Sequence, residues 1–364
     1  MATSEDIPSQ QHSELIPIPR SLQIALFLIG LFWLIVARLT ADHASSGIAT
    51  RLGFSQYPTA FLGELFFLFL ILTGFALFQS IVTRSGGIRS TNALPTRPTA
   101  RREWQLGATI GWAAILVAVL PMMLVGDLHP TFWLTPHALF LTLLTAVTLA
   151  LNTLAIEAAF RGFLFRRLIG VFGTTLATIL LSGLYALASS FRPNATPGSV
   201  FITFLFGVLL SLAYLRTHAI WLGWGLHFAW AAVMGIAFGL PIADLNSYST
   251  LVDTTVSGST FLTGGAYGPE AAPFTILVLI AAMFVLYQAT RDYAWEYTHA
   301  PILAAGYAMD VAPPPAHTAM EQAAAARPSL IQIAPTTATL PSTSTEVQQH
   351  LRDLQKLRDD GSPQ

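Results

Sequence analysis

Four ionisable side chains stand inside long apolar stretches of this sequence and are its first candidates for chemistry. A charged group deep in a bilayer costs about 2.5–3.5 kcal/mol on insertion scales, so such groups tend to mark functional sites. Carboxylates and imidazoles also serve as general acids and bases in hydrolysis. The four are Glu64, Glu157, Arg161 and His227. Weaker polarity comes from Asn152, Tyr185 and Ser189.

Glu157 and Arg161 have a spacing that favours direct interaction on a helix. Four residues advance a helix by about 400°, so both side chains project from one face. Glutamate ahead of arginine is the favourable order for such a pair, and pairing lowers the cost of each charge. Two interpretations remain open. The pair is either a structural ion pair at the cytoplasmic end of a membrane span or a catalytic carboxylate held by a guanidinium.

His227 lies within Trp221–Trp230, an otherwise apolar run that contains glycine. It is either a core histidine bound to a backbone carbonyl or tyrosine, or a functional group that faces the interior of a helix bundle. Because Glu157 is assigned to Arg161, the sequence leaves His227 without a carboxylate partner. Glu64 stands near the start of another apolar run, and we interpret it as an interfacial carboxylate.

The composition indicates which elements must position these groups. Of the 364 residues, 53% are hydrophobic and 10% are charged, whereas an average soluble protein has about 25% charged residues. Runs of about 20 apolar residues are long enough to cross a bilayer as helices. The sequence therefore predicts an all-α fold, a polytopic membrane helix bundle of about eight transmembrane helices. The eight apolar runs are 22–39, 61–82, 106–125, 138–160, 174–188, 200–215, 220–240 and 274–289.

Charge and cysteine content exclude several functions. The net charge of -1 argues against a nucleic-acid partner. The absence of cysteine rules out disulfides, cysteine-bound zinc and a cysteine nucleophile. We predict no cofactor and no metal site, with membrane lipid and a membrane protein or peptide substrate as partners. Arginines gather in alternate loops, which predicts an integral protein of a bacterial cytoplasmic membrane with both termini in the cytoplasm.

Changes in composition along the chain predict its organisation. Residues 1–20 form a polar N-terminal segment, and residues 21–295 form the membrane helix-bundle domain. Residues 296–364 are rich in Pro, Ala, Ser and Thr and predict a disordered tail. Within it, residues 346–358 have the spacing of a short amphipathic helix. We also expect a long loop at His43–Thr59.

Three stretches of the sequence, Ile156–Leu164, Phe206–Thr217 and Leu226–His227, resemble motifs of the CAAX prenyl protease and bacteriocin-processing family, also called Abi, of intramembrane endopeptidases. Ile156–Leu164 is similar to the family's first motif, Glu-Glu-x-x-x-Arg with Phe before and Gly after the arginine. Phe206–Thr217 and Leu226–His227 resemble its third region, which ends in His-x-x-x-Asn or His-x-x-x-Asp. The likeness covers roughly residues 138–289 and includes Thr263–Glu270, which resembles a downstream stretch.

The resemblance implies hydrolysis of a peptide bond within the membrane by a water molecule that glutamate and histidine activate. Members of the family are described as metalloproteases or as glutamate proteases. Carried over by position, the catalytic residues of this chain are Glu157, Arg161 and His227. Three family positions have lost their polar groups. They are Ile156 for the first glutamate, Ser189 for a histidine and Ala231 for the asparagine or aspartate.

Three functions follow from these observations. The favoured one is a CAAX-protease-like homologue with reduced or absent peptidase activity that binds a peptide, a lipid or a membrane partner. The alternative is an active intramembrane peptidase that uses Glu157 and His227. The third is a transporter-like membrane protein, which would need a continuous polar pathway through several spans.

Overall fold

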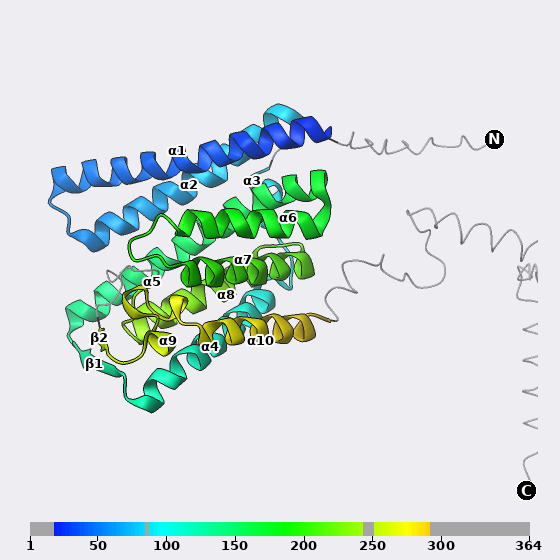
Figure 1. Ribbon diagram of the computed structural model, residues 1–364. Helices are drawn as coiled ribbons and strands as arrows, with labels where there is room; N and C mark the ends of the chain where they lie inside the picture. Colours follow the sequence, from blue (N-terminus) through cyan, green and yellow to red (C-terminus); the bar gives the residue numbers. More distant parts are fainter. Residues whose placement is uncertain (1–17, 84–86, 243–250, 292–364) are drawn as a thin grey trace, which may run out of the picture. The chain divides into compact units, whose positions relative to one another are not determined.

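The computed structural model describes residues 18–83, 87–242 and 251–291 (Figure 1). The predicted tail, its amphipathic helix at 346–358 and nearly all of the predicted N-terminal segment lie outside the described residues. The described part is mostly helical, which confirms an all-α polytopic membrane bundle. Its α-helices and strands are α1 Arg20–Leu52, α2 Gln56–Thr83, α3 Ile88–Thr91, α4 Ala100–Val125, β1 Leu128–Phe132, α5 Pro136–Glu157, α6 Phe165–Ser189, α7 Pro197–Thr217, α8 Trp221–Ala232, β2 Val252–Val256, α9 Thr260–Thr263 and α10 Phe274–Ala289. Two π-helical segments follow α5 and α8, at Ala158–Leu164 and Val233–Ala237, and two short 3₁₀ turns occupy Gly265–Tyr267 and Pro269–Ala271.

Each of the eight predicted apolar runs falls on helix, with 220–240 beginning one residue before the helical segment Trp221–Ala237 and ending three residues after it. Five helical stretches of the described chain are long and apolar enough to cross a membrane, and α8 and α10 are shorter apolar helices. The longest stretch, Pro136–Ser189, is broken at Gly173, where φ is 77° and ψ is 174°. That conformation is accessible almost only to glycine. Gly173 therefore separates the fourth predicted run from the fifth.

The predicted loop at His43–Thr59 is wrong, because α1 continues as helix as far as Leu52 and α2 begins at Gln56. Small side chains at a four-residue spacing are buried here, Ser45 and Ala49 within this extension and Ala41 just before it. That spacing places them on one helix face. The segment reads as a loop in sequence because its residues are small and polar, yet small residues allow two helices to approach closely.

Glycines set the position of α8 against α4. A Cβ atom on Gly107 would overlap the Leu222 carbonyl, and one on Gly111 would overlap the Leu226 carbonyl. On the facing helix, a Cβ atom on Gly225 would overlap the carbonyl of Trp104. The two backbones can touch only because these side chains are absent. This contact fixes the helix that carries His227.

The core consists of two clusters of buried apolar side chains. One joins α1, α2, α5 and α6, and the other joins α4, α7, α8 and α10. Outer helix faces expose large apolar side chains such as Phe32, Leu124 and Phe284. In a membrane bundle these faces contact lipid.

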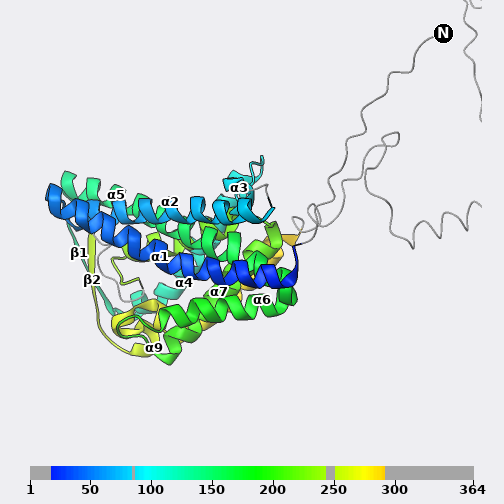
Figure 2. The ribbon, with the colours of Figure 1, turned by 90° about the horizontal axis from the view of Figure 1, so that it is seen from above.

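The sequence did not predict the antiparallel pair β1–β2, which runs from Leu128 opposite Val256 to Phe132 opposite Val252. Both views place this pair at one end of the bundle, with α3 at the other end (Figures 1 and 2). The pair joins two segments that are distant in sequence, on either side of α5 to α8.

Candidate functional site

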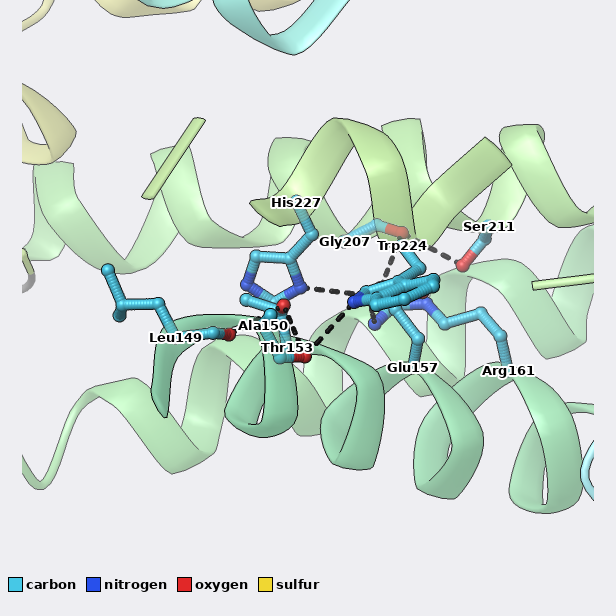
Figure 3. Close-up of polar contacts among 9 residues, drawn as sticks. All are labelled: Leu149, Ala150, Thr153, Glu157, Arg161, Gly207, Ser211, Trp224 and His227. Carbon is cyan, nitrogen blue, oxygen red and sulfur yellow. Dashed lines mark hydrogen bonds and ion pairs between the residues drawn. The ribbon is translucent and has the colours of Figure 1, made fainter. Parts of the chain in front are cut away.

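Glu157, Arg161 and His227 meet in the interior of the bundle (Figure 3). Nδ1 of His227 lies 2.9 Å from Oε1 of Glu157, and a guanidinium nitrogen of Arg161 lies 3.4 Å from the same oxygen. The side chains of Glu157 and Arg161 are 0% and 1% exposed. Because a carboxylate can only accept hydrogen bonds, the imidazole N–H is the donor. The structure therefore brings together the three residues that the sequence singled out as catalytic.

Arg161 ties the cluster to two further helices. Its other terminal nitrogen donates to the carbonyl oxygen of Gly207 on α7 at 3.1 Å, and Ser211 donates to that same oxygen at 2.8 Å. The guanidinium also lies over the ring of Tyr185 on α6, 5.3 Å from its centre. A buried guanidinium with one carboxylate, one carbonyl and one aromatic face around it has most of its charge compensated.

Local backbone features place Glu157 against α8. The residue ends α5, and the π-helical segment that follows contains Arg161; π-turns of this kind occur frequently at functional sites. Across the interface, a Cβ atom on Gly223 would lie 3.1 Å from Oε2 of Glu157. Trp224 adds a second link, since its indole N–H donates to the carbonyl of Ala150 at 3.1 Å (Figure 3). Oε2 itself is buried and has no hydrogen-bond partner among the described residues.

Two expectations from the sequence are wrong. His227 does have a carboxylate partner, because Glu157 contacts both the arginine and the imidazole. Glu64 is not an interfacial carboxylate. It is 6% exposed, and it accepts hydrogen bonds from Arg38 at 2.7 Å and from Asn152 at 2.9 Å. Both errors concern partners on other helices, which sequence spacing cannot reveal.

A cavity of about 530 Å³ opens beside the cluster. Its wall is formed by side chains from α1, α2 and α5 to α8, with contributions from α10 and from the loop that precedes it. His227 lines this cavity, whereas the fully buried Glu157 has no surface on it. The three positions with lost polar groups, Ile156, Ser189 and Ala231, all line it. The cavity therefore brings together His227 and the three positions that the sequence identified as having lost their polar groups.

Two residues of the cavity wall were missed as candidates. Glu270 accepts a hydrogen bond from the indole of Trp230 at 3.0 Å. Tyr267 is 1% exposed, and its hydroxyl faces Ser189 and Thr203. Burial raises the pKa of Tyr267, and the nearby carboxylate of Glu270 raises that pKa further. The sequence did contain a signal for these two residues, because both belong to Thr263–Glu270, a stretch that resembles one found in family members.

The cluster does not fit a metal ion. Glu157 and His227 supply at most two ligands, while a catalytic zinc takes three from the protein. The Glu157 oxygen that faces His227 is also shared with the guanidinium of Arg161, which would repel a cation. Across residues 18–83, 87–242 and 251–291, no three His, Asp or Glu side chains are grouped so that they could hold one.

Fold and site together define a polytopic membrane helix bundle with a buried acid–guanidinium–imidazole cluster beside a cavity. Residues 138–233 match the family described as type II CAAX prenyl endopeptidase Rce1-like. Residues 138–233 thus form a domain of this family of CAAX proteases, which confirms the resemblance seen in the motifs. The match ends before Thr263–Glu270. Neither the curated proteins nor the solved structures contain a match to this chain.

Proposed function

We propose that this protein is a CAAX-protease homologue with reduced or absent peptidase activity, whose cavity binds an apolar segment of a peptide or lipid. The observation that carries the proposal is the chemistry of the cavity wall. Ile156 presents only hydrocarbon where the family resemblance predicts a glutamate. Ala231 presents only a methyl group where it predicts an asparagine or aspartate. The hydroxyl of Ser189 already donates to the carbonyl of Ala186 at 2.7 Å.

The one carboxylate retained from the first motif does not reach the cavity. A general base must lie within hydrogen-bond distance of the water that it activates. Glu157 is fully buried, and Oε1 is already engaged by Arg161 and His227. Its neighbour Ile156 lies on the cavity, about 100° around the helix from Glu157. Turning Glu157 toward the cavity would break the contacts with both partners.

Restoring the lost side chains tests this proposal. The triple variant Ile156→Glu, Ser189→His, Ala231→Asn, purified into liposomes, is expected to cleave a prenylated CAAX peptide faster than the wild type does. The matched control is the same triple variant with His227→Ala, which should be inactive. Wild-type cleavage as fast as that of the triple variant would overturn the proposal.

A second candidate function, an active peptidase that uses Glu157 and His227, is favoured by one observation. The second ring nitrogen of His227 is directed away from Glu157 toward Leu149, which also lines the cavity (Figure 3). There it could take a proton from water as the water oxygen bonds to the peptide carbonyl carbon. The same proton would then pass to the departing amine, while Glu157 holds the imidazolium. Wild-type turnover that both His227→Ala and Glu157→Ala abolish would support this candidate.

We further propose that the protein lies in a bacterial cytoplasmic membrane with both termini in the cytoplasm. The support for this orientation is the gathering of arginines in alternate loops. Because the chain has no cysteine, single introduced cysteines report sidedness cleanly. In intact cells, a membrane-impermeant maleimide should label Ser259→Cys, in the loop before α10. It should label Ser344→Cys, in the tail, only after lysis, and the reverse pattern would contradict this orientation.

A further inference from the structure

A second polar cluster lies on the cavity wall, built around Glu64 of α2. Arg38 of α1 donates to one oxygen of its carboxylate at 2.7 Å, and Asn152 of α5 donates to the other at 2.9 Å. All three residues line the cavity. Glu64 and Arg38 lie outside residues 138–233, so the match to the protease family assigns no role to them.

The carboxylate of Glu64 stands close to a position that has lost one. Asn152 and Ile156 are one helical turn apart on the same face of α5, and both line the cavity. Asn152 thus holds the Glu64 carboxylate four residues, roughly 6 Å along the helix, from Ile156. A carboxylate from α2 therefore stands in this part of the cavity, where α5 itself presents isoleucine.

The charges around Glu64 make this part of the wall a hydrogen-bond acceptor. The guanidinium of Arg38 gives two of its nitrogens to Asp42, at 3.1 and 2.9 Å, and the third to Glu64. Two carboxylates therefore share one guanidinium. One carboxylate oxygen of Glu64 accepts a hydrogen bond from Arg38 and the other accepts one from Asn152. Each oxygen can accept a further hydrogen bond. The cluster carries a net charge of -1, and the side chains next to it on the wall include Leu34, Ile35 and Phe67.

We propose that Glu64 binds the hydrogen-bond-donating head group of an apolar molecule held in the cavity, with an ammonium preferred over a hydroxyl. An acceptor within an apolar wall selects a ligand that has an apolar chain and a donor at its end. The preference for an ammonium follows from the net negative charge of Glu64, Arg38 and Asp42. This inference rests on the proposed function, because it assumes that the cavity binds a ligand.

Three photoreactive decyl probes test the proposal, each with a diazirine on the chain and differing only in an ammonium, hydroxyl or carboxylate head group. They are crosslinked to the full-length protein in detergent, and labelled peptides are identified by mass spectrometry. The ammonium probe should label cavity-wall residues at about ten-fold lower concentration than the carboxylate probe, as expected for a hydrogen bond to a charged group. Glu64→Gln should remove that difference.

Asp42→Asn is the matched control. Asp42 also pairs with Arg38, but it is about half exposed and does not line the cavity. This variant should retain the preference for the donor head groups over the carboxylate, because Glu64 still accepts the hydrogen bond, and should lose only the preference for ammonium over hydroxyl, because the cluster becomes neutral. The comparison of head groups in the wild type needs no variant, so the proposal stays testable even if Glu64→Gln folds poorly.

The outcomes separate the two proposals. Cavity labelling that is equal for all three probes, or that is unchanged in Glu64→Gln, would overturn the role of Glu64 and leave cavity binding intact. Strongest labelling by the carboxylate probe would also overturn it and would point to Arg192, an exposed residue of the same wall. If no probe labels the wall of the wild type, the binding function fails and the role of Glu64 with it.

Discussion

Replacing either member of the buried Glu157–Arg161 pair by leucine should destabilise the protein far more than replacing both. In Glu157→Leu, a guanidinium that is 1% exposed keeps only the carbonyl of Gly207 as its acceptor. In Arg161→Leu, the carboxylate keeps only His227. Removing one partner of a buried ion pair typically costs about 3–5 kcal/mol, because it leaves an uncompensated charge.

The double variant removes both charges together. A buried pair replaced by apolar side chains is often close to neutral. The remaining cost is the unpartnered imidazole N–H of His227, about 1–3 kcal/mol for a buried donor that loses its acceptor. At about 2–4 °C per kcal/mol for a domain of comparable size, each single variant should melt about 6–20 °C below the wild type. The double variant should melt at a higher temperature than either single variant.

Thermal melting of the detergent-purified protein, followed by tryptophan fluorescence, measures these differences. Arg38 and Asp42 form the matched control, because they have the same four-residue spacing but are 41% and 49% exposed. An exposed pair contributes about 1 kcal/mol or less, so Asp42→Leu should shift the melting temperature by only a few degrees. If the double variant melts below both single variants, the two charges are not coupled and the buried pair is not what holds the site together.

Two further predictions concern helix packing and pH. Gly225→Ala should lower the melting temperature by the equivalent of about 1–3 kcal/mol, since its Cβ would overlap the Trp104 carbonyl. Gly183→Ala is the control and should not lower it, because there is open space around Gly183. Equal effects of the two substitutions would contradict the packing of α4 on α8. Burial, with a smaller effect from Arg97, lowers the pKa of His218 below its ordinary 6.5. Below about pH 6.5 the unfolded chain therefore binds more protons than the folded protein does. The stability of the fold should fall as the pH drops through this range. His218→Asn, which suits the left-handed backbone there (φ 51°), should flatten this dependence of melting temperature on pH, and an unchanged slope would exclude His218 as its source.

The sequence by itself determined the class of the protein and most of its helices. Apolar runs of bilayer length predict membrane helices because the backbone must satisfy its own hydrogen bonds in lipid. That requirement is local, so runs such as 106–125 and 274–289 coincide with α4 and α10 at one or both ends. The spacing of Glu157 and Arg161 likewise sufficed to predict their contact, since a single helix sets it.

Where a local pattern is ambiguous, the prediction failed. Ser45 and Ala49 are small and lie in the predicted loop, yet they are buried along α1. Their burial depends on contact with a second helix, which the pattern of one segment does not contain. The π-helical turn at Ala158–Leu164 was not predicted either.

Tertiary structure alone decided which polar groups share the cavity. His227 reaches Glu157 across 70 residues of sequence, and Asn152 reaches Glu64 across 88. Such pairings depend on how closely helices approach, which the glycines of α4 and α8 permit without specifying a partner. Buried charges require partners in a medium of low dielectric constant. A charged residue in an apolar run therefore indicates that a partner exists, but only the packing of the helices determines which residue it is.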